Sequence, residues 1–453
     1  MRRLLLAALA AGTLLATGCA RNPAPEVDGV RFAPVTFPRG VEVSNAELAE
    51  DFLLYTFALE TGETLDRLLR YEEPVTVHFR PGLADYRPDI DALFHRLREE
   101  AEIDIREAAT PEAALIVVET VPRAELDRVF REAACFIVPG ESGWRSFVRK
   151  RPEEVARWGE LERLGRAAIF LPADTDPQDA RDCLHEEITQ ALGPANDLYR
   201  VADTIWNDDN LHGIATPRDM LMLRVLYSPW LRAGMSREEV AARLPAVLDR
   251  LNPRGRGIEP RARHPESRPW NSAIEVALSR HATHAERRGA ARIAVGLARE
   301  MRPVDHRLAV SLLALGRLEL RRNPAAAAGN FLEAYDLSRR LHGDDDIRTA
   351  HAAAHLAAMA LAAGSHDTAI RLASAHLDGA RNGQNAVLLA GLKSIEAEAL
   401  LGLGQLREAQ AARLDSLRWA RYGLGDGDGR LAREQAALAE ILSIDADASG
   451  DGN

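Results

Sequence analysis

The feature that most restricts the fold of this chain is a run of helix and strand breakers near its middle. Between residues 252 and 270 these breakers are Pro253, Gly255, Gly257, Pro260, Pro265 and Pro269. Proline fixes φ and removes a backbone donor, so neither a helix interior nor a strand interior accepts this density. Strand-like and helix-like segments alternate upstream, whereas the downstream sequence is helical in its periodicity. We therefore expect an α+β domain at 44–250, a linker at 251–270 and an all-α domain at 271–440.

Length and charge restrict the class of protein further. The chain has 453 residues, of which 46% are hydrophobic and 28% charged, and this balance is typical of a globular protein with more than one domain. Its formal net charge of −11 argues against nucleic acid as a main partner.

The N-terminus has the pattern of an export signal. Two arginines precede an apolar run that ends at Leu15 and is too short for a permanent membrane span. The next four residues are Ala-Thr-Gly-Cys. This ending resembles the lipobox of bacterial lipoproteins, whose cysteine is acylated. The resemblance implies a signal peptide at 1–18, a lipid on Cys19 and a tether at 19–43, and a plain secretory signal is the alternative.

A lipid on Cys19 implies a membrane partner and a place in the cell envelope, facing the periplasm. Ala20 follows where an aspartate would suggest the inner membrane, which favours the outer membrane. In an oxidising compartment we expect Cys135 and Cys183 to form a disulfide, with two reduced thiols as the alternative. The acidic, glycine-containing tail at 441–453 is expected to be disordered.

The downstream domain has an internal repeat. Turns at 323–324, 364–367 and 402–404 are each followed by a helical segment with a small residue, and these residues are Ala328, Ala369 and Ala409. A period of about 40 residues is typical of paired-helix solenoids. The pattern resembles tetratricopeptide repeats, which implies helical grooves that bind a protein partner. A generic helical bundle is the alternative.

The upstream domain carries the most informative group of residues, within 182–197. Glu186 and Gln190 are four residues apart, so they share one face of the expected helix, with Glu187 beside them. Zinc-protease helices use this arrangement for two ligands and a glutamate that activates water. Asn196 follows a glycine at the place where the longer metzincin motif brings up its third ligand.

The resemblance to metzincins extends beyond this helix. Thr204, Ile205 and Trp206 take the place of the metzincin Met-turn, and a helix capped by Thr216 follows. Expected strands at 74–79, 103–107, 114–119 and 167–171, with a helix at 88–100, give the order of elements in a zincin lobe. The resemblance implies an α+β zincin or metzincin-like fold. The Glu-Glu…Gln helix also resembles a family of uncharacterised proteobacterial lipoproteins.

The residues at the ligand places differ from those of metzincins, and the difference affects which metal they could bind. The three ligand places hold Glu186, Gln190 and Asn196, whereas zinc prefers nitrogen and sulfur donors. Oxygen ligands suit calcium or magnesium, but both normally need more of them than this motif supplies. Only Glu187, the expected water-activating glutamate, is kept. The sequence therefore predicts no bound metal and no cofactor, and it favours a protein that is not an enzyme.

Two functional hypotheses follow. In the first, a zinc-less, non-catalytic metzincin-like domain and a partner-binding helical repeat form an envelope scaffold. In the second, the domain is a divergent peptidase or cell-wall hydrolase with Glu187 as general base. A purely structural polar network around Glu187 also remains open.

Overall fold

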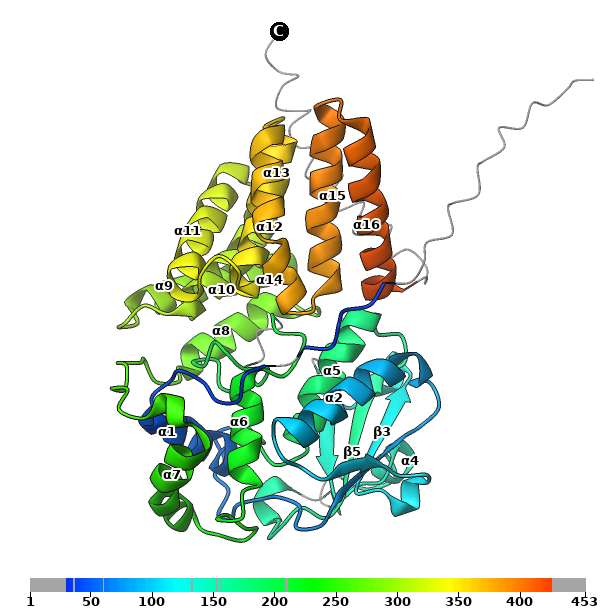
Figure 1. Cartoon of the computed structure of the whole chain (residues 1–453), viewed down its shortest axis with the longest axis vertical. Coiled ribbons are helices and arrows are strands. Elements are labelled where there is room, and N and C mark those ends of the chain that lie inside the picture. The colour runs from blue at the N-terminus through cyan, green and yellow to red at the C-terminus, as the bar shows by residue number, and fades with distance from the viewer. Residues whose placement is uncertain are drawn as a thin grey trace, which may run out of the picture.

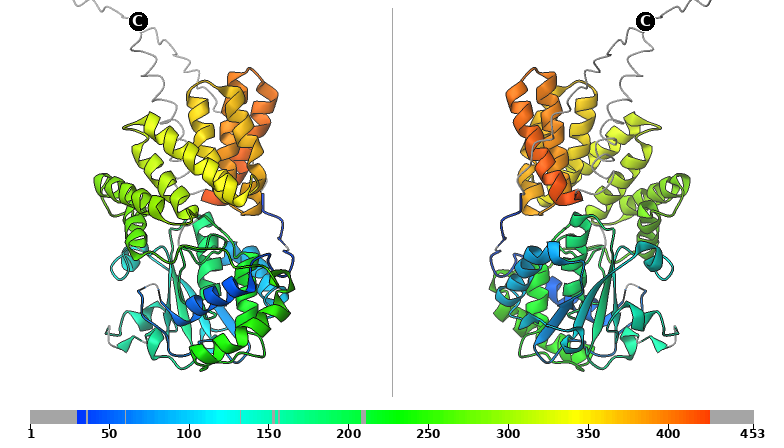
Figure 2. Two further views of the ribbon diagram at one scale, coloured as in Figure 1. Left: turned by 90° about the vertical axis from the view of Figure 1, so that its left-hand side faces the viewer. Right: turned by 90° about the vertical axis from the view of Figure 1, so that its right-hand side faces the viewer.

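The structure is a computed structural model, which describes residues 30–425 except 36, 60, 132, 152, 153, 156 and 208–210. An α/β N-terminal region with a five-stranded mixed sheet lies below a helical C-terminal region (Figures 1 and 2). The predicted change of architecture along the chain is confirmed. The predicted signal at 1–18, the lipidation site Cys19 and the tail at 441–453 fall outside the described residues.

The sheet has the strand order β2-β1-β3-β5-β4. Its first four members are parallel and β4 is antiparallel to β5. The strands are β1 (Val75–Phe79), β2 (Ile105–Glu107), β3 (Ile116–Val121), β4 (Phe136–Pro139) and β5 (Ala167–Pro172). The four predicted strands are confirmed. Strand β4 was not predicted.

Both faces of the sheet are covered, because successive side chains of a strand point to opposite sides. Ile169 and Leu171 of β5 belong to the large core that also contains residues of α2 (Arg87–Glu99) and α5 (Pro177–Gln190). Ala168 and Phe170 face the other way, into a smaller core that also contains residues of α3 (Arg123–Leu126) and α4 (Trp144–Phe147). The predicted helices at 88–100 and 182–192 therefore correspond to α2 and α5.

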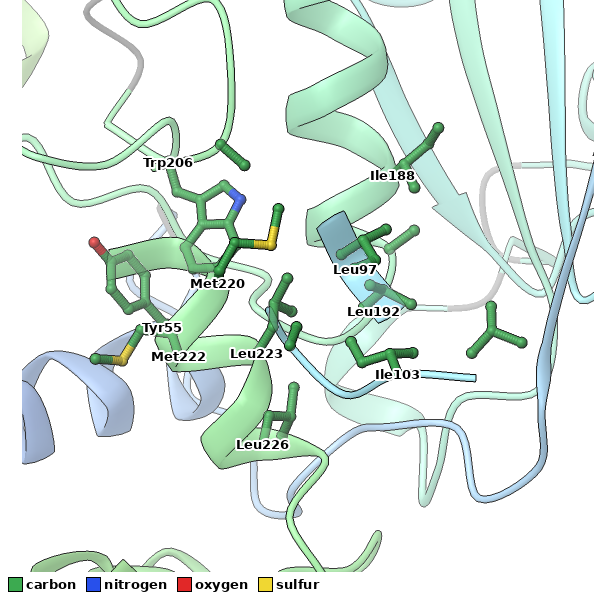
Figure 3. Close-up of a cluster of buried hydrophobic side chains, with 14 of the residues drawn as sticks. Tyr55, Leu97, Ile103, Ile188, Leu192, Trp206, Met220, Met222, Leu223 and Leu226 are labelled. Carbon is green, nitrogen blue, oxygen red and sulfur yellow. The ribbon is translucent and has the colours of Figure 1, made fainter. Parts of the chain in front are cut away.

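Three further helices complete the α/β region: α1 (Asn45–Phe57), α6 (Pro217–Leu226) and α7 (Arg237–Leu251). The predicted cap of α6 is confirmed, since the Thr216 hydroxyl accepts from the Asp219 backbone N–H and the Asp219 carboxylate accepts from that of Thr216. In Figure 3, side chains of α5 and α6 face each other, with Trp206 and Tyr55 at one end of the cluster. Helices α1 and α7 were not predicted.

Gly193 lies shortly after the end of α5, where the chain turns away from the helix. Gly193 has φ +138°, and a Cβ there would lie 2.5 Å from the Leu69 carbonyl oxygen. A side chain at this position is therefore excluded by the close approach of the backbone as well as by its conformation.

The helical region runs from α8 to α16, with short connections between neighbours (Figure 1). Its helices are α8 (Arg268–Leu278), α9 (His284–Glu300), α10 (His306–Glu319), α11 (Pro324–His342), α12 (Ile347–Ala362), α13 (His366–Ala375), α14 (Leu377–Asn382), α15 (Ala386–Gly402) and α16 (Leu406–Leu424). Ala369 and Ala409 are buried as expected. Ala328 is partly exposed and Ala327 is buried in its place, because the predicted face of α11 was one residue out of register.

Two helices of this region begin in the same way. Asp305 accepts from the backbone N–H of Arg307 over 3.0 Å, and Asp346 accepts from that of Arg348 over 2.9 Å. In each case the guanidinium of the same arginine also pairs with the aspartate. The recurrence of this start at α10 and α12 agrees with a repeat of about 40 residues.

The breaker-rich segment lies against both regions. The backbone N–H of Arg261 donates to Glu47 of α1 over 2.5 Å, and the Glu266 carboxylate accepts from the backbone N–H of Arg200 over 2.8 Å. The carbonyls of His264 and Pro265 accept from Arg307 at the start of α10 over 3.2 and 3.0 Å. This segment therefore connects α1 to the helical region through hydrogen bonds.

Candidate functional site

Helix α5 carries the predicted site residues on its buried side. Glu187 and Gln190 are 5% and 9% exposed, and Glu186 is half-buried. Asn196, in the loop after α5, is 5% exposed. The site is therefore a largely enclosed polar surface between α5 and the loop that follows it.

The two amides of the predicted site are each held by a neighbour. The Gln190 side-chain amide donates to Asp197 over 2.8 Å, and that of Asn196 donates to the Leu54 carbonyl at the end of α1 over 3.0 Å. These two hydrogen bonds hold the loop after α5 against α5 and α1.

The predicted disulfide between Cys135 and Cys183 is confirmed, with its Cα atoms 6.1 Å apart. Its Cys135 sulfur and one carboxylate oxygen each of Glu186 and Glu187 all lie within 4.8 Å of one another. Within the part of the chain that the structure describes, this is the single group of three His, Cys, Asp or Glu side chains with that spacing. The disulfide thus lies directly beside the two adjacent glutamates.

The turn at 204–206 contacts α5 through the side chain of Trp206. Trp206 is fully buried, and its indole N–H donates to the Thr189 hydroxyl of α5 over 2.9 Å. The ring meets that of Tyr55 edge to face, with centroids 5.2 Å apart, and lies beside Met220 in Figure 3. Trp206 therefore joins α1, α5 and α6 through one side chain.

Asp219 holds this turn in place. Its carboxylate accepts from the Thr204 hydroxyl over 2.5 Å and from the backbone N–H groups of Ile205 and Thr216 over 3.0 and 2.7 Å. Burial raises the pKa of Asp219 to about 6, although these hydrogen bonds oppose the shift. Asp219 thus takes part in the cap of α6 and also accepts the hydrogen bonds that hold the turn at 204–206.

A buried ion-pair network near the site was missed by the sequence analysis. Asp51 of α1 is fully buried and pairs with Arg200 at 2.5 Å, Arg218 at 2.9 Å and Arg263 at 2.8 Å. The three arginines come from the loop after α5, from α6 and from the breaker-rich segment. No spacing rule connects residues so far apart, so the sequence carried no signal for this network.

A group of buried histidines at the junction of the two regions was also missed. Burial lowers the pKa of His212 and of His306 to about 4 and that of His342 to about 3. The nearby Arg348 lowers the pKa of all three further, whereas Asp346 raises the pKa of His212 and His342. The His306 ring donates from Nε2 to the Tyr199 carbonyl over 2.7 Å, so these groups lie where the loop after α5 meets α10.

The first half of α5 is covered by the last helices of the chain. The Gln178 side chain accepts from the backbone N–H of Ala386 at the start of α15 over 2.9 Å. The guanidinium of Arg181 lies over the Tyr422 ring, 4.0 Å from its centroid. Phe32, in the segment before α1, stacks on Trp419 of α16 with ring centroids 4.5 Å apart. Helix α5 therefore forms part of the contact between the α/β region and the helical region.

The fold and the site together define an α/β domain whose polar site lies on one helix, with a helical region docked on it. Residues 45–246 match the model of a family described as "Protein of unknown function (DUF2927)". The chain thus carries a DUF2927 domain, which contains the sheet, α5, the Thr204–Trp206 turn and α6 and ends within α7. No curated protein matches the chain.

Proposed function

We propose that the protein is a lipid-anchored scaffold or binding protein of the cell envelope with a metzincin-like but non-catalytic domain. The observation that carries this proposal is the donor set at the three ligand places, where Gln190 and Asn196 supply amides in place of histidine nitrogens. Both donate their amide N–H groups to neighbours, Asp197 and the Leu54 carbonyl. The remaining ligand place, Glu186, supplies one carboxylate.

The implied zinc ion does not fit this set of residues. One carboxylate and two amides lack the nitrogen and sulfur donors that zinc prefers. Glu187, which would activate a zinc-bound water in the alternative hydrolase, is 5% exposed beside the disulfide. A base with so little exposure and no metal has no route for lowering the pKa of a water molecule.

The order of elements supports the metzincin-like part of the proposal. Strand β1 is followed by α2, by β2 and β3, by the site helix α5 and then by the capped helix α6. The indole N–H of Trp206 donates to Thr189 of α5, and this contact between the turn and the site helix supports the proposed likeness to a Met-turn.

The helical region is the proposed partner-binding part, with a tetratricopeptide-like repeat. Several large apolar side chains on its outer surface are exposed, namely Ile293 at 59%, Leu332 at 53% and Leu406 at 61%. Apolar side chains held on rigid helices are typical of surfaces that bind other proteins.

The lipid on Cys19 would hold this surface near the membrane. A fully extended chain spans at most about 3.6 Å per residue, so Phe32 would lie within about 47 Å of the lipid attachment point. Phe32 packs on α16, which sets the distance of the helical region from the membrane.

Three measurements test the proposal. Cys19→Ser should move the protein from the membrane fraction to the soluble periplasmic fraction and abolish labelling with a fatty-acid analogue. Protein purified without chelator or reductant should contain far less than one zinc per chain; stoichiometric zinc would contradict a non-catalytic domain. In vivo cross-linking should capture a partner that is lost in Leu332→Asp but retained in Glu333→Gln, an adjacent control.

The hydrolase alternative makes a different prediction. If Glu187→Gln abolished cleavage of a peptide or cell-wall substrate while protein level and unfolding were unchanged, the scaffold proposal would be wrong. Glu238→Gln, at an exposed position on α7, is the control for the loss of one carboxylate.

A further inference from the structure

We propose that reduction of the Cys135–Cys183 disulfide creates a zinc site, in which the Cys135 thiolate and the carboxylates of Glu186 and Glu187 are the protein ligands. This set differs from the metzincin ligand places, because it omits Gln190 and Asn196 and draws its sulfur from the loop before β4. The inference goes beyond the scaffold proposal and concerns a different redox state of the protein.

The geometry supplies the first argument. The Cys135 sulfur and the oxygens of Glu186 and Glu187 lie within 4.8 Å of one another. In a tetrahedral zinc site with bonds of about 2.0–2.3 Å, ligand atoms lie roughly 3.5 Å apart. The three atoms must therefore approach by about 1 Å, with the two carboxylates exchanging their present contacts for the ion, and the fourth position is left for a water molecule.

The chemistry of sulfur supplies the second argument. In the disulfide, the Cys135 sulfur is neutral and bonded to Cys183, so it is a poor ligand. A dithiol reductant transfers two electrons to the S–S bond, becomes a disulfide itself and leaves two cysteine thiols. The Cys135 thiol then loses its proton on binding zinc, since the thiolate is the ligand.

The charge of the ligand set supplies the third argument. A thiolate and two carboxylates carry three negative charges in a largely enclosed place, and a divalent cation offsets most of this charge. Glu187 is 5% exposed and Cys183 is 4% exposed, whereas Cys135 is half-buried and can be reached by an external thiolate. One soft sulfur donor with two oxygens suits zinc better than calcium or magnesium, which take oxygen ligands.

The position of the site links it to the helical region. The carbonyls of Arg131 and Ala133, in the loop that leads to Cys135, accept from His281 and Arg280 after α8 over 2.8 and 2.9 Å. Helix α5 contacts α15 through Gln178. Both segments that supply ligands are therefore held by the helical region, which preserves their spacing when the disulfide is broken.

A matched pair of variants tests the proposal. Cys135→Ser and Cys183→Ser both remove the disulfide, but only Cys183→Ser keeps the proposed thiolate ligand. Full-length Cys183→Ser should bind one zinc per chain, and cobalt should give it the near-ultraviolet absorption of a thiolate-to-cobalt transition. Cys135→Ser should bind zinc at least about tenfold more weakly and lack that absorption.

The wild-type protein provides a test that does not depend on either variant folding. Wild-type protein reduced anaerobically with a dithiol and then desalted should take up one zinc, and oxidised wild type should not. Far-ultraviolet circular dichroism checks that the reduced protein is still folded. In the reduced protein, Glu186→Gln should weaken zinc binding by about the same factor as Cys135→Ser. Equal zinc binding by the two cysteine variants, or no gain of zinc on reduction, would overturn the proposal. Zinc in the oxidised protein would instead contradict the scaffold proposal, so the two failures are distinguishable.

Discussion

The indole N–H of Trp206 donates to the hydroxyl of Thr189 over 2.9 Å, which ties the turn at 204–206 to the helix that carries Glu186 and Glu187. The same hydroxyl donates to the His185 carbonyl of α5 over 2.7 Å. One hydroxyl thus connects the turn at 204–206 to the backbone of the site helix, so this contact stabilises the turn against α5.

Trp206→Phe should lower the free energy of unfolding by about 2–4 kcal/mol, because it leaves a cavity and removes the donor to Thr189. Urea unfolding followed by circular dichroism measures this change. Trp230→Phe is the control: Trp230 is half-buried beneath the Arg250 guanidinium, and its replacement should cost less than about 1 kcal/mol. Equal losses of unfolding free energy in the two variants would contradict the stabilising role assigned to Trp206.

Asp51→Asn should destabilise the protein by about 3–5 kcal/mol, because it leaves Arg200, Arg218 and Arg263 around a neutral side chain in a buried place. The matched control is Glu50→Gln. Glu50 pairs with two of these arginines but is 61% exposed in its side chain, so its loss should cost no more than about 1 kcal/mol. Thermal unfolding of both variants at one pH and salt concentration compares them, and similar losses would show that burial does not decide the strength of this network.

Acid should weaken the junction between the two regions through His306. Burial lowers the pKa of His306 from 6.5 to about 4, with Asp305 opposing and Arg348 and Arg307 adding to the shift. The unfolded chain therefore binds the proton first, and the contribution of His306 to stability is complete above pH 6.5 and falls as the pH decreases towards 4. The expected slope is about 1.4 kcal/mol per pH unit.

His306→Gln keeps an N–H donor for the Tyr199 carbonyl but does not titrate. Its free energy of unfolding should therefore fall less steeply than that of the wild type between about pH 6.5 and about pH 5, by roughly 2 kcal/mol over this range. Parallel pH profiles for the two proteins would refute the role assigned to His306. His284→Gln, at an exposed position on α9, should leave the wild-type slope unchanged.

Phe32→Ala should loosen the attachment of the segment before α1 to the helical region. Its ring stacks on Trp419 and meets Tyr422 edge to face at a centroid distance of 5.8 Å, and such pairs contribute about 0.5–1.5 kcal/mol beyond burial. Amide hydrogen exchange should therefore become faster in the last turns of α16. Pro34→Ala, at an exposed position in the same segment, should leave this exchange unchanged.

Much of the α/β region could be predicted from local patterns. The apolar run at 74–79 identified β1, and Thr216 identified the start of α6, because both signals lie within a few residues. Strand β4 and helices α1 and α7 gave no comparable signal. Helix α1 places its buried polar residues, such as Asp51 and Glu47, on the face where the period of a helix calls for apolar ones.

The candidate site, too, was only partly predictable from local sequence patterns. The sequence placed Glu186, Glu187 and Gln190 on one face of a helix and paired Cys135 with Cys183. It contained nothing that put the Cys135 sulfur beside both glutamates, or that turned the Gln190 amide towards Asp197, because those contacts join different elements of the fold.

By itself, the amino-acid sequence determined the division of the chain at its breaker-rich segment, the helix that carries the site, and the pairing of its two later cysteines. The first two of those properties depend on backbone conformation and helical period, which neighbouring residues specify. The tertiary structure alone decided that the helical region docks on α5, that Asp51 gathers three arginines, and that the disulfide lies against Glu186 and Glu187. These are contacts between segments far apart in the chain, whose distances are set by the packing of the whole molecule.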